Sequence, residues 1–319
     1  MSLLDTLFGG HRENDAPDLM GAIAWAVDRV DPLLKQMGSY PDRYRKPVAH
    51  ALEYAHGLAA RIPGPVAITP ESYVADPVVR AMFPMQDDVH VALQRSRDMQ
   101  IFLQDSPEVN EVYALMCMRR RTKAMLGMEM DGEILRRDVP QEAVYFTDYT
   151  LADPGPSEAE ARQRIARGLF ESLIVHVANR IDARKREKLD LIHERDEVLA
   201  QMHSASAERR PEYEAGLRRV LDRLGELVAA LELDHYHKDF EAVLLEPERH
   251  VFLEYAEMNL DSMGIVCQPD TSGSGEVRFC DLIGRDRRRW TVVIMYCIDV
   301  KNRATITDRL ASAQRWLGL

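Results

Sequence analysis

The sequence has few cysteines, a deficit of positive charge and no long apolar run. Its 319 residues include four cysteines, and none of them forms a CxxC pair, so neither a disulfide framework nor a zinc ribbon is predicted. With 41 Lys and Arg against 52 Asp and Glu, the net charge of -11 disfavours a dedicated nucleic-acid-binding protein. No apolar run reaches the roughly 18 residues of a transmembrane helix, and the first residues lack the pattern of a signal peptide. We therefore expect a reducing cytoplasm as the compartment.

Recognisable catalytic motifs are missing as well. The sequence contains no phosphate-binding loop, no GxGxxG after a predicted strand, no GxSxG nucleophile elbow and no EF-hand loop. The stretch HERDE at 193–197 resembles the start of a zinc-binding helix, but Glu197 stands where the second histidine would be. These absences favour a non-enzymatic protein.

The composition, 46% hydrophobic and 29% charged, is that of a chain with a packed core. Its patterns predict a mostly helical α+β fold with an N-terminal helical layer, two antiparallel β-meanders and a long antiparallel αα coiled-coil hairpin. The predicted segments are a flexible or amphipathic N-terminus (1–14), a helical layer (15–110), a β-meander (111–156), the coiled-coil arm and its base (157–246), and a helix, a second β-meander and a C-terminal helix (247–319).

The N-terminal residues 2–8 place Leu3, Leu4, Leu7 and Phe8 on one side of a short helix. Such a helix predicts weak membrane association or docking in a partner groove. A frayed terminus or an intramolecular contact explains the same residues.

Residues 111–151 change in character from the helical region before them. Asp131-Gly132 between two short runs is a signal for a two-residue hairpin, and the runs around it are rich in aromatic, methionine and β-branched residues. These features predict a meander, and one further helix over 108–126 is the competing interpretation. The methionines could offer soft ligands to Cu(I), or they could simply fill an irregular core.

The coiled-coil arm is predicted from an unusually long helical pattern. A helix is expected from Ser157 to about His203, polar nearly all round at 182–190, where it would leave the body of the protein. A second helix follows Pro211, and its apolar residues alternate by four and three, which is a heptad seam. The seam residues are Tyr213, Leu217, Val220, Leu224, Leu227 and Leu231.

After the arm, the pattern predicts one helix from about Pro247 to Gly264, where a left-handed glycine would end it. Three strand-like runs follow at 264–268, 276–283 and 290–298. Thr305 then caps a last helix that ends at Trp316.

A possible metal site lies where the arm joins the body. An antiparallel hairpin would place His176 level with the stretch DHYHKD at 234–239, and His176 and His235 both lie on apolar stripes. Two imidazoles and the carboxylate of Asp239 could bind a divalent metal ion, and His237 could join them only if the segment were extended. The alternative is that these are hydrogen-bonded seam histidines with solvated aspartates.

An arginine cluster beside an indole is the second candidate site. Arginine forks next to a tryptophan suit phosphate, carboxylate or stacked-base recognition. A solvated hairpin loop that protects a strand edge explains the same residues. The candidate anion-binding residues are Arg285, Arg287, Arg288, Arg289 and Trp290.

Three hypotheses for function follow. The first is a non-enzymatic cytoplasmic interaction or assembly protein that binds a protein partner or a second copy of itself and needs no cofactor. The second is a metal-binding protein or metal-dependent hydrolase centred on His176, His235 and Asp239. The third is an anion or nucleic-acid binder that acts through its arginine clusters.

Overall fold

The computed structural model describes residues 19–68, 77–83, 96–131, 134–261, 263–268, 274–284 and 288–298. The protein has an α+β fold, and the chain divides into two compact units. Unit 1 comprises residues 1–7, 55–169 and 251–319, and unit 2 comprises residues 8–54 and 170–250. Each unit is therefore assembled from segments that are far apart in the sequence. The boundary falls inside the helices α3, Asp42–Arg61, and α8, Glu158–Ser204.

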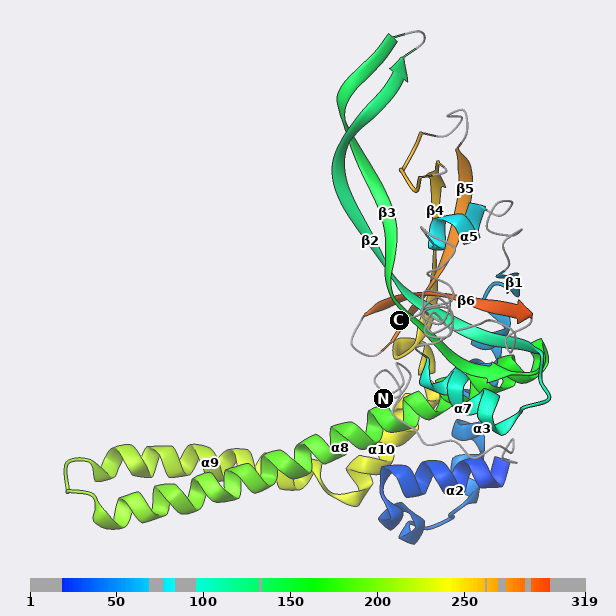
Figure 1. Cartoon of the computed structure of the whole chain (residues 1–319). Coiled ribbons are helices and arrows are strands. Elements are labelled where there is room, and N and C mark those ends of the chain that lie inside the picture. The colour runs from blue at the N-terminus through cyan, green and yellow to red at the C-terminus, as the bar shows by residue number, and fades with distance from the viewer. Residues whose placement is uncertain are drawn as a thin grey trace, which may run out of the picture. The chain divides into compact units, whose positions relative to one another are not determined.

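A six-stranded sheet forms the centre of unit 1 (Figure 1). Five of the strands follow the order β3-β2-β6-β5-β4, and their pairings are antiparallel. The short β1 pairs in parallel with β6. The strands are β1 (Val66–Ala67), β2 (Glu111–Asp131), β3 (Ile134–Gly155), β4 (Phe252–Leu260), β5 (Gly275–Ile283) and β6 (Arg289–Ile298).

The segment that follows β4 bridges β4 and β3, the two strands at the ends of this order. The Val144 N–H donates to Gly264 O, and the Val266 N–H donates to Glu142 O, both at 2.8 Å. Gly264 has φ +78°, and a Cβ at this position would lie 2.8 Å from Val144 O, so the close approach requires glycine. The sheet edge at β3 is thus paired at residues 142–144.

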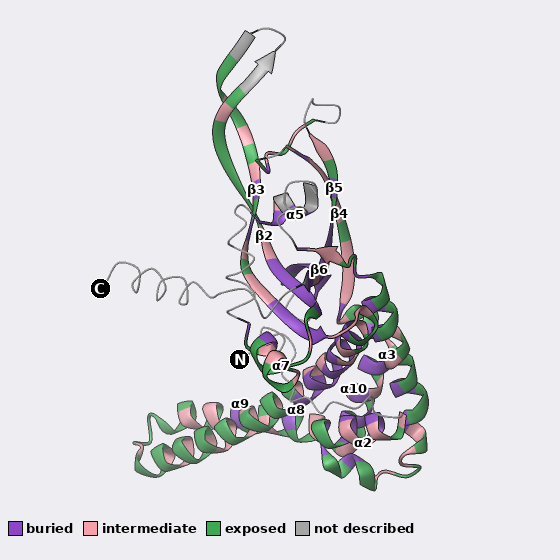
Figure 2. Ribbon diagram, turned by 45° about the vertical axis from the view of Figure 1, so that its right-hand side comes forward, coloured by how far each residue is buried: buried purple, intermediate pink, exposed green. Residues whose placement is uncertain are grey.

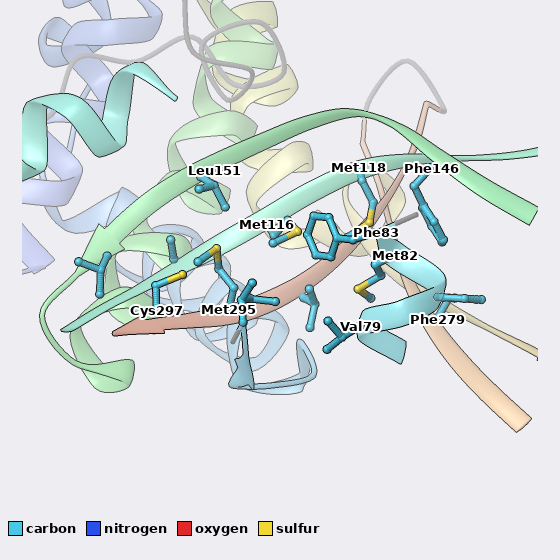
Figure 3. Close-up of a cluster of buried hydrophobic side chains, with 14 of the residues drawn as sticks. Val79, Met82, Phe83, Met116, Met118, Phe146, Leu151, Phe279, Met295 and Cys297 are labelled. Atoms are coloured by element: carbon cyan, nitrogen blue, oxygen red, sulfur yellow. The ribbon is translucent and has the colours of Figure 1, made fainter. Parts of the chain in front are cut away.

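The core of unit 1 lies on one face of the sheet (Figure 3). Alternate residues of β2 and β6 point into it, and the helices α5 (Pro77–Met82) and α7 (Arg97–Asp105) add side chains from outside the sheet. The opposite face of β2 is also buried at Leu115 and Cys117, which explains why this strand appears in the sequence as a nearly continuous apolar run. The labelled residues of this core are Val79, Met82, Phe83, Met116, Met118, Phe146, Leu151, Phe279, Met295 and Cys297.

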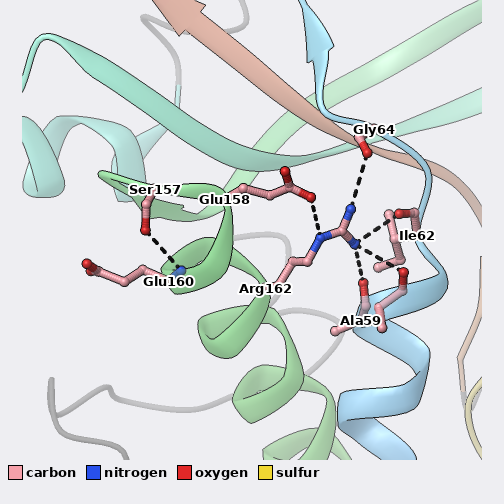
Figure 4. A network of polar contacts seen from close by, with 8 residues as sticks. Ala59, Ile62, Gly64, Ser157, Glu158, Glu160 and Arg162 are labelled. Atoms are coloured by element: carbon pink, nitrogen blue, oxygen red, sulfur yellow. Dashed lines mark hydrogen bonds and ion pairs between the residues drawn. The ribbon is translucent and has the colours of Figure 1, made fainter.

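Arg162, in the first turns of α8, completes the C-terminal end of α3 (Figure 4). Its Nη1 donates to Ala59 O at 2.6 Å and Ile62 O at 3.0 Å, and its Nη2 donates to Gly64 O at 3.2 Å. Its Nε donates to Glu158 at 2.7 Å. One guanidinium therefore satisfies carbonyls that the end of a helix leaves without intrahelical partners.

Unit 2 is helical in its described part. It contains α2 (Leu19–Val30), a 3-10 helix (Pro32–Gln36), the first part of α3, most of α8, α9 (Arg210–Ala230) and α10 (Leu233–Leu245). Trp25 packs against Phe170 with ring centroids 6.4 Å apart, and Tyr44 packs against Phe240 at 5.4 Å. Asp31 caps the 3-10 helix and binds Lys185 at 2.9 Å.

The helix α9 lies beside the second half of α8 (Figures 1 and 2). We call residues 182–230, which comprise the end of α8, the turn and α9, the helical pair. Arg223 Nη2 binds Glu187 Oε1 at 2.8 Å across it. The residues of α9 expected to line a seam are among its least exposed, since Val220 and Leu227 are buried and Tyr213, Leu217 and Leu224 are half-buried.

Several element predictions are confirmed and others are wrong. The long helix, the helix after it, the antiparallel pairing on either side of Asp131 and Ile134, and the last two strands lie close to where the sequence predicts them. The helix expected from Pro247 to Gly264 is wrong, because a 3-10 turn over Pro247–Arg249 leads directly into β4. The alternative helix over 108–126 is wrong as well, since β2 occupies that range.

The two predicted meanders are parts of one sheet, because β2 pairs with β6. Of the predicted strand at 264–268, the structure shows only two isolated bridges, at Ile265 and Val266. The N-terminal segment and the C-terminal helix predicted from Thr305 to Trp316 lie outside the described residues.

Candidate functional site

The helix α10 separates the two histidines of DHYHKD. It runs through this stretch, so positions 235 and 237 point roughly 200° apart. His235 is exposed, with Glu232 at 3.9 Å, whereas His237 is buried. The condition under which His237 could join His235 in one site, an extended segment, is not met.

His237 belongs to a polar cluster between α10 and α3. Its Nε2 lies 2.6 Å from Arg43 Nη2 and 3.1 Å from Glu241 Oε2, and its ring meets Tyr44 edge-on at 5.6 Å. Burial, and then the nearby Arg43, lower the pKa of His237. Because a guanidinium can only donate, its hydrogen bond needs Nε2 as the acceptor, which favours the neutral imidazole, as the lowered pKa does. A ring nitrogen that accepts from arginine is not available to a metal ion.

Asp239 binds arginines. Its Oδ2 accepts from Arg184 Nη1 at 2.7 Å and from Arg180 Nη2 at 3.4 Å. Both arginines come from α8, so the carboxylate ties α10 to α8. An aspartate held by two guanidinium groups has a structural explanation that needs no metal ion.

His176 lies beside His250, with ring centroids 5.0 Å apart. Burial, and then Arg180, lower the pKa of His250, so this imidazole also favours its neutral form. Among the residues that the structure describes, no group of three or more His, Cys, Asp or Glu side chains is arranged to hold a metal ion. The metal site stays a prediction that this geometry does not support.

The predicted anion-binding residues are divided between the described and the undescribed parts of the chain. Arg285 and Arg287 lie outside the described residues, and Arg288 is exposed. Arg289 binds Glu254 at 2.6 Å and lies 3.6 Å from Asp281. Trp290 is buried, so its indole is not presented to a stacking base.

Other contacts, not predicted from the sequence, surround Trp290 and Asp281. The Arg119 guanidinium lies 4.7 Å from the centre of the Trp290 ring. Asp281, buried on β5, accepts from Arg120 at 2.6 Å and from the Thr291 hydroxyl at 2.7 Å. Asp281 is a charged residue inside the apolar run FCDLI. Because a charged residue in a buried strand is usually paired, this pattern could have predicted a buried ion pair.

The cysteines are not arranged for nucleophilic chemistry. All four are free thiols. Burial raises the pKa of the Cys117 thiol, and it raises the pKa of Cys280 to about 11. Both thiols stay protonated near neutral pH, where a nucleophile would need the thiolate.

The β2–β3 hairpin extends beyond the strands that pair with it (Figure 1), and large apolar side chains are exposed toward its far end. We call residues 125–131 and 134–141 the distal ribbon. β2 pairs with β6 only as far as Met118, and β3 pairs with the segment after β4 only at residues 142–144. Within the described part of the chain, the ribbon thus has no strand on its outer edges. Leu126 is 65% exposed and Met128 is 61% exposed.

No family model, curated protein or solved structure matches this chain. In the described residues, none of the helices is long and apolar enough to cross a membrane. The candidate surfaces are therefore interpreted from their own geometry.

Proposed function

We propose that this chain is a non-enzymatic cytoplasmic interaction or assembly protein. It acts through surfaces of its sheet and through an antiparallel coiled-coil arm, residues 157–232. The observation that carries the proposal is the distal ribbon. A two-stranded ribbon is at best marginally stable in water. Large apolar side chains that stay exposed on it also have a higher free energy than they would have if they were buried. A protein partner that covers Leu126 and Met128 or pairs with a strand edge would remove both costs.

The helical pair supports the same proposal. Its seam repeats by four and three, and most of its other exposed residues are polar or charged. Helices of this kind present a long rigid face, which suits binding to another protein more than it suits a small-molecule site.

The cytoplasmic assignment is supported by the cysteines. All four are free, and the pKa values of Cys117 and Cys280 are raised by burial, as is usual for cysteines that only fill space. A reducing compartment preserves such thiols.

A photo-crosslinking amino acid placed at Met128 in living cells tests the interaction. We expect a discrete cross-linked product at Met128, and none at Glu276, an exposed position of β5 that serves as the matched control. A second probe at Leu221 tests the helical pair. If neither probe gives a product beyond the control, the interaction function is wrong.

A further inference from the structure

The two sides of the helical pair differ in character. On one side, Arg223 of α9 binds Glu187 of α8 and also Glu226 at 3.0 Å. Leu189 of α8 is 57% exposed, and Leu221 and Val228 of α9 are 46% and 45% exposed. These three leucine and valine side chains are large apolar groups left in water on an otherwise polar pair of helices.

The exposed leucine and valine residues of both helices lie on one side of the pair. At about 100° per residue, Leu221 and Val228 lie roughly 70° to 90° from the middle of the α9 seam, and Arg223 lies at a similar angle on the other flank. On α8, Leu189 lies on the flank opposite Glu187 by the same construction. Because the helices run in opposite directions, these two flanks coincide. The ion pair therefore marks one side, and Leu189, Leu221 and Val228 mark the other, which we call the apolar side.

The register supports this assignment. Glu187 and Arg223 are in contact, and two residues closer to the turn on each helix are Leu189 and Leu221. The two leucines are therefore level with one another. Four seam residues next to them, Ile192, Leu199, Leu217 and Leu224, are only half-buried. Together with Leu221 and Val228, the seam residues of α9 form an apolar stripe about 120° wide. Contact with α8 alone leaves one flank of this stripe exposed.

A second copy of the same helical pair fits this surface. The pair extends for roughly 30 Å at 1.5 Å per residue, and two helices side by side are roughly 20 Å wide. Two such faces in contact would bury on the order of 1,200 Å², which reaches the size of specific interfaces. Residues 182–230 contain ten Lys and Arg and eleven Asp and Glu, so two copies can approach here although the whole chain carries -11.

We propose that two copies of this chain associate through the apolar side of the helical pair, forming a four-helix bundle around Leu189, Leu221 and Val228. The proposal rests on the proposed assembly function and names its partner as a second copy. A two-fold axis makes such a face complementary to itself, and each helix then has antiparallel neighbours on two sides. The half-buried seam becomes the centre of the bundle.

Light scattering of the full-length chain after size exclusion, at about 1 to 100 µM, tests the proposal. We expect the wild type to have twice the mass of one chain at the upper concentrations. The triple variant Leu189→Gln, Leu221→Gln and Val228→Gln should show half that mass. Glutamine is a good helix former at exposed positions, and far-UV circular dichroism should report the helical content of the wild type.

The matched control changes three exposed residues on the other side of the same helices, Glu194→Gln, Glu212→Gln and Arg219→Gln. This variant should keep the wild-type mass. If the glutamine triple variant loses helical content, the alanine triple variant at the same positions replaces it, since alanine has the highest helix propensity.

Different results separate the two proposals. A dimer that persists in the triple variant overturns the apolar side as its interface and leaves the assembly function standing. A wild type that is monomeric at all concentrations overturns the self-association. If its cross-linking probes also give no product, the proposed function fails independently.

Discussion

At the residue scale, Arg162 connects the start of α8 to the end of α3, Asp42–Arg61, which lies about a hundred residues earlier in the sequence. Its guanidinium contacts Ala59, Ile62 and Gly64, which lie at the end of α3 and in the turn after it. Arginine can do this because its five donors have a fixed planar arrangement, whereas lysine presents one flexible ammonium group.

We expect Arg162→Met to lower the free energy of unfolding by about 3 kcal/mol, because the carbonyls then lose charge-assisted hydrogen bonds. Arg162→Lys should recover part of this loss. Urea unfolding followed by circular dichroism measures the change, and Arg97→Lys, at an exposed position of α7, is the control. An Arg162→Met variant as stable as the wild type would contradict the structural role.

His237 makes a pH-dependent contribution to stability. Burial and Arg43 lower its pKa in the folded protein below the value of about 6.5 in the unfolded chain. As the pH falls below about 6.5, the unfolded state binds more protons than the folded state. The contribution of His237 to the free energy of unfolding is therefore complete above about pH 6.5 and is lost as the pH falls through the pKa of the folded protein. The lowered pKa of His250 acts in the same direction.

Urea unfolding at pH 7.5 and pH 5.5 should thus show a smaller free energy of unfolding at the lower pH. In His237→Gln this difference should shrink, because one of the two titrating groups is gone. His235→Gln is the matched control, since His235 is exposed on the same helix, and it should keep the wild-type difference. Equal differences in all three proteins would contradict the prediction.

The candidate site residues were only partly predictable from the sequence. Helical spacing correctly predicts that the side chains of His235 and His237 point in different directions if α10 is continuous. Nothing in the local sequence predicts that Arg43 donates to His237, or that Arg184 and Arg180 bind Asp239. Such pairs depend on how distant helices pack, which a single sequence does not specify.

At the element scale, amphipathic helices were easier to predict than short strands. The heptad seam and the start at Ser157 locate α8 and α9 closely, because a period of three to four residues over many turns is a strong signal. The strand β4, FLEYAEMNL, has a helix-compatible composition and was predicted as helix. Its neighbour β5 decides its conformation, since strand propensity depends strongly on cross-strand packing.

Gly264 illustrates the same limit. A left-handed glycine is predicted here from the sequence, and its φ of +78° agrees. The residue does not end a helix, however; it lies in the turn after β4, next to β3. We expect Gly264→Ala to cost about 1 to 3 kcal/mol, because of its backbone angle and its approach to Val144 O. Hydrogen exchange at the amides of Val144 and Val266 should accelerate. Gly275→Ala, whose Cβ would meet nothing within 4 Å, should change neither.

The seam of the helical pair gives a second prediction at this scale. Leu227→Asp should lower the free energy of unfolding by about 3 kcal/mol or more, because it places an unpaired charge at a buried position. Leu224→Asp should cost less, since Leu224 is half-buried. Arg218→Asp, exposed on the same helix, should stay within about 0.5 kcal/mol. Equal effects at all three positions, measured by urea unfolding, would contradict a packed seam.

At the scale of the whole molecule, the division into units could not be predicted from the sequence. Sequence patterns predict five consecutive segments, whereas the structure groups residues 55–169 with 251–319, and 8–54 with 170–250. The link inside unit 1 depends on the pairing of β2 with β6 across nearly two hundred residues. Neither hydrophobic periodicity nor turn signals contain information about such distant pairing.

This arrangement makes a specific prediction for a chain cut at the turn of the helical pair. A site-specific protease sequence inserted between Ala207 and Glu208 would give two fragments, and each fragment contains residues of both units. Because each unit needs segments from both fragments, the cut chain should elute as one species with the circular dichroism of the uncut protein. The fragments 1–207 and 208–319 expressed separately should fail to fold, since each lacks part of both cores. Separation of the cut fragments without denaturant would contradict the discontinuous units.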